Sequence, residues 1–243
     1  MRKAILLIFT AFICLSSCNK SPKQIVYVGV DPAFFPLELF GKEPNLLGFC
    51  NEILQEIGAY KKCHFERMNV SWEALLEGLH GNKYQAILSS MQPYVFNEKK
   101  YAFSHLFLLT GPVLVVPEGS KIKNFKMLEY KEVVSLDLWS EQLLVDIAPD
   151  VLPRRGDTIS KSLLGLKLGR YDAAFIPSIP AEGFVADLYA QELKIVTQPA
   201  GEAGLRFVTL NGDNEELVRI FNEGLKHLMK SGKYEELLIK WKL

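Results

Sequence analysis

The feature that most constrains the fold is the alternation of strand and helix patterns along the chain. β-Branched apolar runs bounded by Gly, Pro or Asp predict strands, and apolar residues three or four positions apart predict helices. The predicted strands are 24–30, 64–68, 86–91, 132–136, 172–176, 193–197 and 205–210, with a very apolar stretch at 112–117 after 103–110. The predicted helices are 49–57, ended by Gly58, then 72–79, 141–147, 158–168 and 215–231.

This order of elements indicates an α/β protein of two lobes. Strand, helix, strand, helix, strand is interpreted as occurring twice, and repeated βα units favour mainly parallel sheets with helices on both faces. We expect lobe 1 to comprise residues 24–110 and 201–243, and lobe 2 residues 111–200. The chain would then cross twice between the lobes, with hinges near 110–113 and 200–204, and a cleft would lie between the two sheets.

Composition excludes several classes of function. Hydrophobic residues make up 49% and charged residues 23% of the 243 positions, as in ordinary folded proteins. Lys and Arg total 28 and so do Asp and Glu, so no basic field favours nucleic acid as a partner. No apolar run reaches the ~18–20 residues that span a bilayer, which argues against channels and membrane-spanning transporters.

The N-terminal segment predicts export and a lipid anchor. Arg2 and Lys3 precede a short apolar run, a pattern that favours a signal peptide at 1–17 over a buried N-terminal helix. Leu-Ser-Ser-Cys at 15–18 resembles the bacterial lipobox, in which the signal is cut before a cysteine that then carries lipid. Cys18 is therefore the predicted lipidation site, at the start of a polar tether over 18–23. Acyl chains there would hold the protein at a membrane.

The remaining cysteines and the histidines predict neither a disulfide nor a metal site. A helix between Cys50 and Cys63 would separate them by about 15 Å or more, beyond the ~7 Å that a disulfide tolerates between Cα atoms. We therefore expect two reduced, mostly buried thiols. The four histidines show no metal-ligand spacing, and no cofactor is predicted.

Six segments carry a family resemblance. The first, 28–37, reads V-G-V-D-P-A-F-F-P-L and is similar to V-G-T-D-x-x-Y-x-P-F; the others are 48–53, 72–91, 103–104, 169–173 and 231–241, the last similar to D-G-x-Y…K-W. In this order they resemble the extracytoplasmic solute-binding proteins of polar amino-acid ABC importers (solute-binding family 3) over about 25 to 242. The resemblance implies a periplasmic-binding-protein-like clamp, which closes on a small ligand and presents it to an inner-membrane permease. It further implies a monomer tethered in the cell envelope, with no catalysis.

The resemblance also implies a ligand site in lobe 1. By position, Phe34 and Trp72 would sandwich the ligand, although both could be plain core residues. Asp31 would pair with a cationic ligand side chain, or it could simply cap the turn before Pro32. The groups expected to meet a ligand carboxylate are Ser89, Ser90 and Gln92.

Both charged anchors of the family are replaced. The Arg of the family's T-x-x-R, which grips the ligand carboxylate, falls on Asn97, and the Asp that ends D-A-x-x-x-D, which grips the ammonium, falls on Pro177. The Gly-Thr that binds carboxylate in lobe 2 is not visible near 138–140. Either a surrogate cation replaces the Arg, or the ligand is not a free amino acid but a peptide, amide, amine or other metabolite; a local misalignment is the third reading. The surrogate candidates are Arg154, Arg155, Lys161 and Arg206.

Two alternative functions remain open. An enzyme on the same scaffold, for instance a cyclohexadienyl dehydratase-like protein, would need a general acid in the cleft, with Asp31 and Glu52 the available carboxylates. A ligand sensor or adhesin would keep the clamp and lose transport.

Overall fold

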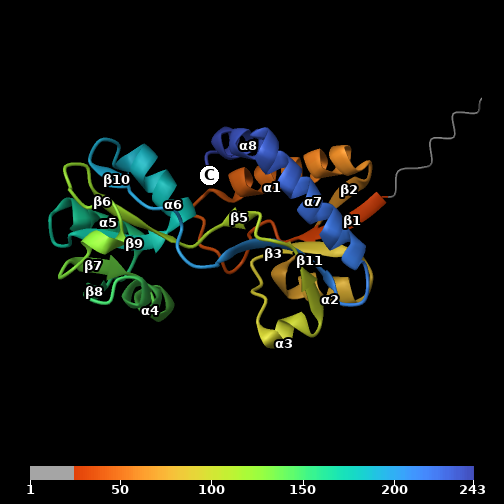
Figure 1. Cartoon of the computed structure of the whole chain (residues 1–243), viewed down its shortest axis with the longest axis horizontal. Coiled ribbons are helices and arrows are strands. Elements are labelled where there is room, and N and C mark those ends of the chain that lie inside the picture. Colours follow the sequence, from red (N-terminus) through yellow and green to blue (C-terminus); the bar gives the residue numbers. More distant parts are fainter. Residues whose placement is uncertain (1–24) are drawn as a thin grey trace, which may run out of the picture.

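The computed structural model describes residues 25–243, which form two β-sheets with helices packed on their faces (Figure 1). Cys18 and the predicted signal and tether lie outside the described residues. The predicted bilobal α/β fold is confirmed, because each sheet carries its own helices and cores.

The first sheet has the strand order β2-β1-β3-β11-β4, and β5 pairs with β11. Its strands are β1 (Ile25–Val30), β2 (His64–Asn69), β3 (Ala86–Ser89), β4 (Tyr101–Phe103), β5 (Leu108–Leu109) and β11 (Gly204–Leu210). β1 runs parallel to β2 and β3, whereas β11 runs antiparallel to its neighbours.

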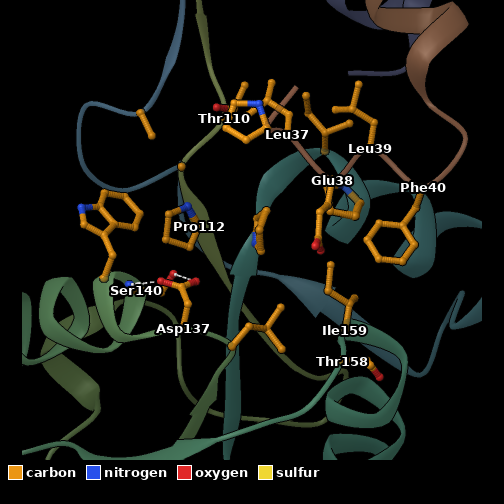
Figure 2. A pocket seen from close by; sticks show the side chains of 18 of the residues that line it. Leu37, Glu38, Leu39, Phe40, Thr110, Pro112, Asp137, Ser140, Thr158 and Ile159 are labelled. Atoms are coloured by element: carbon orange, nitrogen blue, oxygen red, sulfur yellow. Dashed lines mark hydrogen bonds between the residues drawn. The ribbon is translucent and has the colours of Figure 1, made fainter. Parts of the chain in front are cut away.

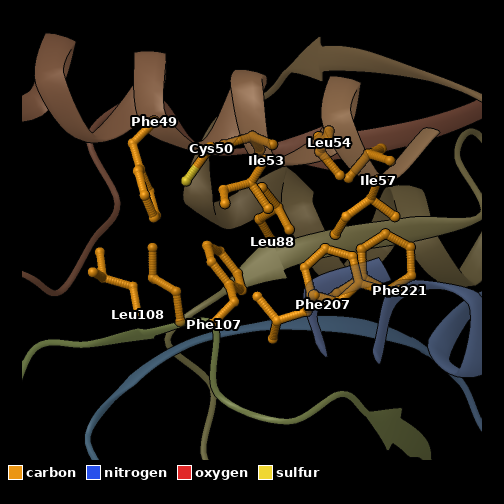
Figure 3. Packing of buried hydrophobic residues seen from close by; sticks show 14 of the residues in the cluster. Phe49, Cys50, Ile53, Leu54, Ile57, Leu88, Phe107, Leu108, Phe207 and Phe221 are labelled. Atoms are coloured by element: carbon orange, nitrogen blue, oxygen red, sulfur yellow. The ribbon is translucent and has the colours of Figure 1, made fainter. Parts of the chain in front are cut away.

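Two cores sandwich this sheet. On one face lie α1 (Glu43–Lys61), α7 (Glu215–Ser231) and α8 (Lys233–Trp241), whose core includes stacked Phe207 and Phe221 with ring centroids 4.7 Å apart (Figure 3). On the other face α2 (Trp72–His80) packs on Tyr84, Ile87 and Val208. Alternate residues of β3 and β11 therefore serve different cores, as the two-residue period of a strand requires.

The second sheet has the order β10-β6-β9-β7-β8. Its strands are β6 (Pro112–Pro117), β7 (Glu132–Ser135), β8 (Leu152–Arg155), β9 (Ala173–Pro177) and β10 (Leu193–Ile195). Its helices are α4 (Leu138–Ile147), α5 (Ile159–Lys167) and α6 (Ser178–Gly183), with a 3₁₀ turn η1 (Phe125–Met127) and a π-helical turn η2 (Phe184–Leu188). β7 runs parallel to β8 and β9, and β6 runs antiparallel to β9 and β10.

The chain crosses between the sheets twice, and the two crossings lie side by side. The Thr110 amide donates to the Ala203 carbonyl at 2.9 Å, and the Ala200 amide donates to the Pro112 carbonyl at 2.8 Å. A Cβ on Gly111 would lie 2.0 Å from the Ala200 carbonyl oxygen, so only glycine allows this approach. The two segments of the crossing are therefore held together by backbone hydrogen bonds.

Several predicted elements differ from the structure. The sheets are mixed rather than mainly parallel, because the strands next to the crossings, β6 and β11, run against their neighbours. Helix α1 extends through Gly58 to Lys61, and the Cys63 amide closes its end on the Gly58 carbonyl at 3.0 Å. Strand β8 and helices α3 (Val95–Glu98), α6 and α8 were not predicted, whereas α7 has the predicted bounds.

The two cysteines of the described residues differ in burial. No disulfide joins Cys50, which is buried, to Cys63, which is half-buried. Burial raises the pKa of the Cys50 thiol well above its usual range, so it stays protonated. Within residues 25–243, no helix combines the length and apolarity needed to cross a bilayer.

Candidate functional site

A cavity of about 830 Å³ lies between the two lobes (Figure 2). Its lobe-1 wall is the loop after β1, from Pro36 to Phe40, and its lobe-2 wall is formed by the starts of α4 and α5. The crossing residues Thr110, Gly111 and Ala203 close one side. This volume falls within the range of pockets that hold small molecules.

The lobe-2 wall has its polar groups already satisfied. Asp137 begins α4, and its carboxylate accepts hydrogen bonds from the Ser140 amide at 2.9 Å and the Ser140 hydroxyl at 2.8 Å. Thr158 begins α5, and its Oγ1 accepts from the Lys161 amide at 3.2 Å. These side-chain caps use donors that a ligand anion could otherwise reach.

The charged side chains that line the cavity are all acidic: Glu38, Asp137 and Asp157. Asp137 caps α4, and Asp157 pairs with Lys161 at 2.9 Å. Glu38 reaches from the lobe-1 loop into the cavity and has no hydrogen bond or ion pair within residues 25–243 (Figure 2). The cavity therefore favours a positively charged group.

Asp31 caps a turn. It is buried after β1, and its two carboxylate oxygens accept from the Ala33 amide at 3.1 Å and the Phe35 amide at 3.0 Å. Of the two interpretations that the sequence left open, these contacts match the turn cap. The carboxylate is already used by the backbone rather than held ready for a ligand.

The aromatic pair involves Phe35 in place of Phe34. Phe34 is 4% exposed and lies in the core beneath α1, whereas Phe35 is 55% exposed and its ring centroid lies 5.4 Å from that of Trp72. The physical reason is the turn held by Asp31, in which Phe34 takes a left-handed backbone with φ of 52°. The sequence predicts Phe34 as the ring opposite Trp72. Nothing in the sequence distinguishes the buried Phe34 from the exposed Phe35, because the two phenylalanines are adjacent.

The segment after β3 is held by its own hydrogen bonds. Ser89 is buried, and its hydroxyl oxygen accepts from the Met91 amide at 3.1 Å. Gln92 donates from its amide to the Ser90 carbonyl at 3.5 Å, and Asn97 donates from Nδ2 to the Gln92 carbonyl at 2.8 Å. Asn97 therefore orders the loop before α3, a role that needs no charge.

Three of the four surrogate cations have partners in lobe 2. Arg154 pairs with Glu132, Arg155 with Glu141 at 2.6 Å, and Lys161 with Asp157. Arg206 differs. It lies on β11 in the first sheet, is 6% exposed, and its buried Nη1 has no hydrogen-bond partner within residues 25–243.

Glu52, the other carboxylate proposed as a general acid, lies away from the cavity. It is on α1 and forms an ion pair with Lys240 of α8. No group of three or more potential metal-ligating side chains occurs in the described part of the chain.

The two sheets, their double crossing and the cavity between them define the class of two-lobed binding proteins. The sequence of residues 26–243 matches the family model of bacterial extracellular solute-binding proteins, family 3. This chain belongs to that family.

Individual relatives agree with this assignment. The chain is 28% identical over 253 residues to the arginine-binding extracellular protein ArtP of Bacillus subtilis, covering 99% of this chain and 98% of ArtP. It is 24% identical over 243 residues to the histidine-binding periplasmic protein of Escherichia coli, covering 95% and 92%.

Solved structures share the fold. The L-cystine solute receptor of Neisseria gonorrhoeae, unliganded and open, matches with a TM-score of 0.73 and 20% identity over 90% of this chain and 93% of that chain. The second substrate-binding domain of Lactococcus lactis GlnP, also open, gives 0.69 with 16% identity over 90% and 96%.

Proposed function

We propose that this protein is the substrate-binding lipoprotein of an ABC importer and captures a small, amino-acid-like ligand between its lobes without catalysis. The observation that carries the proposal is the family match over residues 26–243, joined to a cavity of about 830 Å³ between two sheets. Relatives named for arginine and histidine binding support an amino-acid-like ligand.

The acidic lining narrows the ligand to one that carries a positive charge. Glu38 is the lining acid whose carboxylate has no partner within residues 25–243, and because Glu38 is exposed, a cation beside it would gain up to about 1 kcal/mol. A basic amino acid fits this wall. An acidic one would meet three carboxylates and few free donors.

Phe35 and Trp72 support a flat or aliphatic ligand group. Both belong to lobe 1, and their ring planes meet at 56°, leaving a tilted aromatic surface. Such a surface excludes water and attracts a guanidinium, an imidazole or an alkyl chain.

Exposed apolar side chains support closure of the clamp. Tyr94, Val95 and Phe96 are exposed at α3 of lobe 1, and Leu138 and Trp139 are exposed at the start of α4 of lobe 2. A ligand that contacts both lobes would favour the closed state by its differential affinity, and these rims would then lose contact with water.

The contacts of Asp31 and Glu52 argue against either residue acting as the general acid of a dehydratase-like mechanism. A dehydratase-like mechanism needs a proton donor in the cleft. Asp31 accepts from two backbone amides, and Glu52 pairs with Lys240 on the outer helices. Neither carboxylate is presented to the cavity as a free acid.

The proposed partner of this protein is an ABC permease. A lipid anchor at Cys18 is proposed from the sequence around that residue. In cells given labelled palmitate, the wild-type protein should incorporate label and sediment with membranes. Cys18→Ser should incorporate none, whereas Cys63→Ser serves as the matched control and should be labelled normally. Label retained in Cys18→Ser would overturn the anchor.

A thermal-shift screen of residues 19–243 with the twenty amino acids and their amides tests the function. A ligand at 100 times its Kd contributes about 2.7 kcal/mol, or a rise in Tm of about 5–10 °C for a chain of this size. We expect L-arginine or L-histidine to produce it, and Trp72→Ala to reduce it to about half or less, while Tyr130→Ala, an exposed aromatic outside the cavity lining, leaves it unchanged. A screen in which no compound raises Tm would contradict the proposal.

A further inference from the structure

An amino-acid-like ligand carries a carboxylate, and the cavity wall offers no cation for it. The charged lining residues are acids, Asn97 is neutral, and Arg154, Arg155 and Lys161 are paired with acids. No side chain on these walls can therefore form an ion pair with a ligand carboxylate. That the ligand has a carboxylate rests on the proposed function.

Arg206 lies on the same face and at the same end of the first sheet as Trp72. Leu205 and Phe207 belong to the core beneath α1, while Val208 belongs to the core beneath α2. By the alternation of a strand, Arg206 lies on the α2 face with Val208. Trp72 packs against that same core, from the first residue of α2.

Ser89 is the direct neighbour of Arg206. The two residues pair across β3 and β11, which places their Cβ atoms about 4.5–5.5 Å apart on one face. The Ser89 hydroxyl oxygen accepts from the Met91 amide, and no acceptor for its hydrogen occurs within residues 25–243. Arg206 and Ser89 thus bring unused donors to the carboxyl end of β3.

The burial of the Arg206 guanidinium is energetically unfavourable. Its side chain is 6% exposed, its Nη1 is fully buried without a partner, and no acid in the described part of the chain forms an ion pair with it. Folded proteins rarely leave a buried charged donor unpaired, because desolvation then goes uncompensated.

Burial also makes the charged form of Arg206 less favourable. Burial lowers the pKa of the Arg206 guanidinium, and the exposed Glu202 offsets this only in part. The guanidinium remains charged at neutral pH. An anion arriving from the cleft would relieve this unfavourable state.

We propose that Arg206 binds the carboxylate of the ligand, with the Ser89 hydroxyl donating a second hydrogen bond to the same group. The guanidinium offers the two parallel donors that a planar carboxylate accepts. This site would lie on the strand that returns from the crossing, on the sheet face covered by α2, which begins at Trp72, and the ligand's cationic part would point toward Glu38 in the cavity.

The test is calorimetric titration with L-arginine and L-argininamide, which differ only in the carboxylate, and with the L-histidine pair. The wild type should prefer each acid over its amide by about 100-fold or more. Arg206→Gln should lose about 10²–10³-fold in affinity for the acid. It should bind acid and amide within about threefold, because the variant and the amide each remove the same pair between guanidinium and carboxylate. Arg206→Lys should restore part of the preference.

Arg67→Gln is the matched control. Arg67 also has a buried Nη1 without a hydrogen-bond partner among the described residues, but it lies on β2 two residues after Phe65, on the α1 face of the sheet. Its replacement should leave the acid preference intact. Preference for the acid kept in Arg206→Gln, or lost equally in Arg67→Gln, would overturn the assignment.

A second measurement needs no ligand. Replacing an unpaired buried charge by an apolar group of similar length should not destabilise the free protein, so Arg206→Met should have a Tm equal to the wild type or about 2–4 °C higher. A lower Tm would make Arg206 a structural residue and overturn its assignment as an anion site. Failure of the wild type to bind any probe would instead overturn the proposed function, so the two failures are distinguishable.

Discussion

The two sides of the cleft differ in how many of their polar side chains already have partners within the protein. On the lobe-2 wall, Asp137 and Thr158 cap their helices and Asp157 pairs with Lys161. On the lobe-1 side, Phe35 is exposed, and within residues 25–243 Glu38 has no ion pair and the buried Nη1 of Arg206 has no hydrogen-bond partner. Groups without partners gain most from a ligand, so lobe 1 is expected to recognise it, and lobe 2 to close over it.

The largest expected effect separates Phe34 from Phe35. Phe34→Ala removes a core ring and should lower the free energy of unfolding by about 3–5 kcal/mol, whereas Phe35→Ala should lower it by less than about 0.5 kcal/mol. Urea denaturation of both variants measures this. Equal losses would show that the two rings are not divided between core and cleft.

The next prediction compares an aromatic residue from each lobe, Trp72 and Trp139. Trp72→Ala should weaken L-arginine binding about 10–100-fold, because the ligand loses its stacking surface in the lobe that binds it first. Trp139→Ala of lobe 2 should weaken it less than about fivefold, since that ring meets the ligand only after closure. Titration calorimetry measures both affinities. A larger loss of affinity in Trp139→Ala than in Trp72→Ala would contradict the proposal that lobe 1 binds the ligand first.

The smallest effect concerns the acids. Glu38→Gln should weaken L-arginine binding about 3–10-fold and leave L-citrulline, its neutral counterpart, nearly unchanged. Asp157→Asn is the control, because Asp157 is exposed and already paired with Lys161, and should change affinity for L-arginine less than about twofold. An equal loss for both ligands in Glu38→Gln would remove the electrostatic role of this residue.

The fold was largely predictable because it depends on patterns that persist over many residues. The period of α7 and the apolar run of β6 gave their bounds directly, and six ordered motifs gave the bilobal arrangement. The strand directions next to the crossings could not be predicted, because antiparallel β6 and β11 read the same in sequence as parallel strands.

The site was less predictable because it depends on single side-chain directions. A left-handed backbone at Phe34 decides which of two adjacent rings is exposed, and no propensity of phenylalanine indicates it. Likewise, four cations were equally plausible substitutes for the missing anchor. Only the ion pairs of Arg154, Arg155 and Lys161 distinguish them from Arg206.

A crystal structure of residues 19–243 with a bound ligand would decide which lobe holds the ligand carboxylate. We expect the carboxylate to lie on Arg206 and Ser89, near Phe35 and Trp72, with lobe 2 closed over it. A ligand whose carboxylate is held by lobe 2, or that lies outside the space between the sheets, would contradict it.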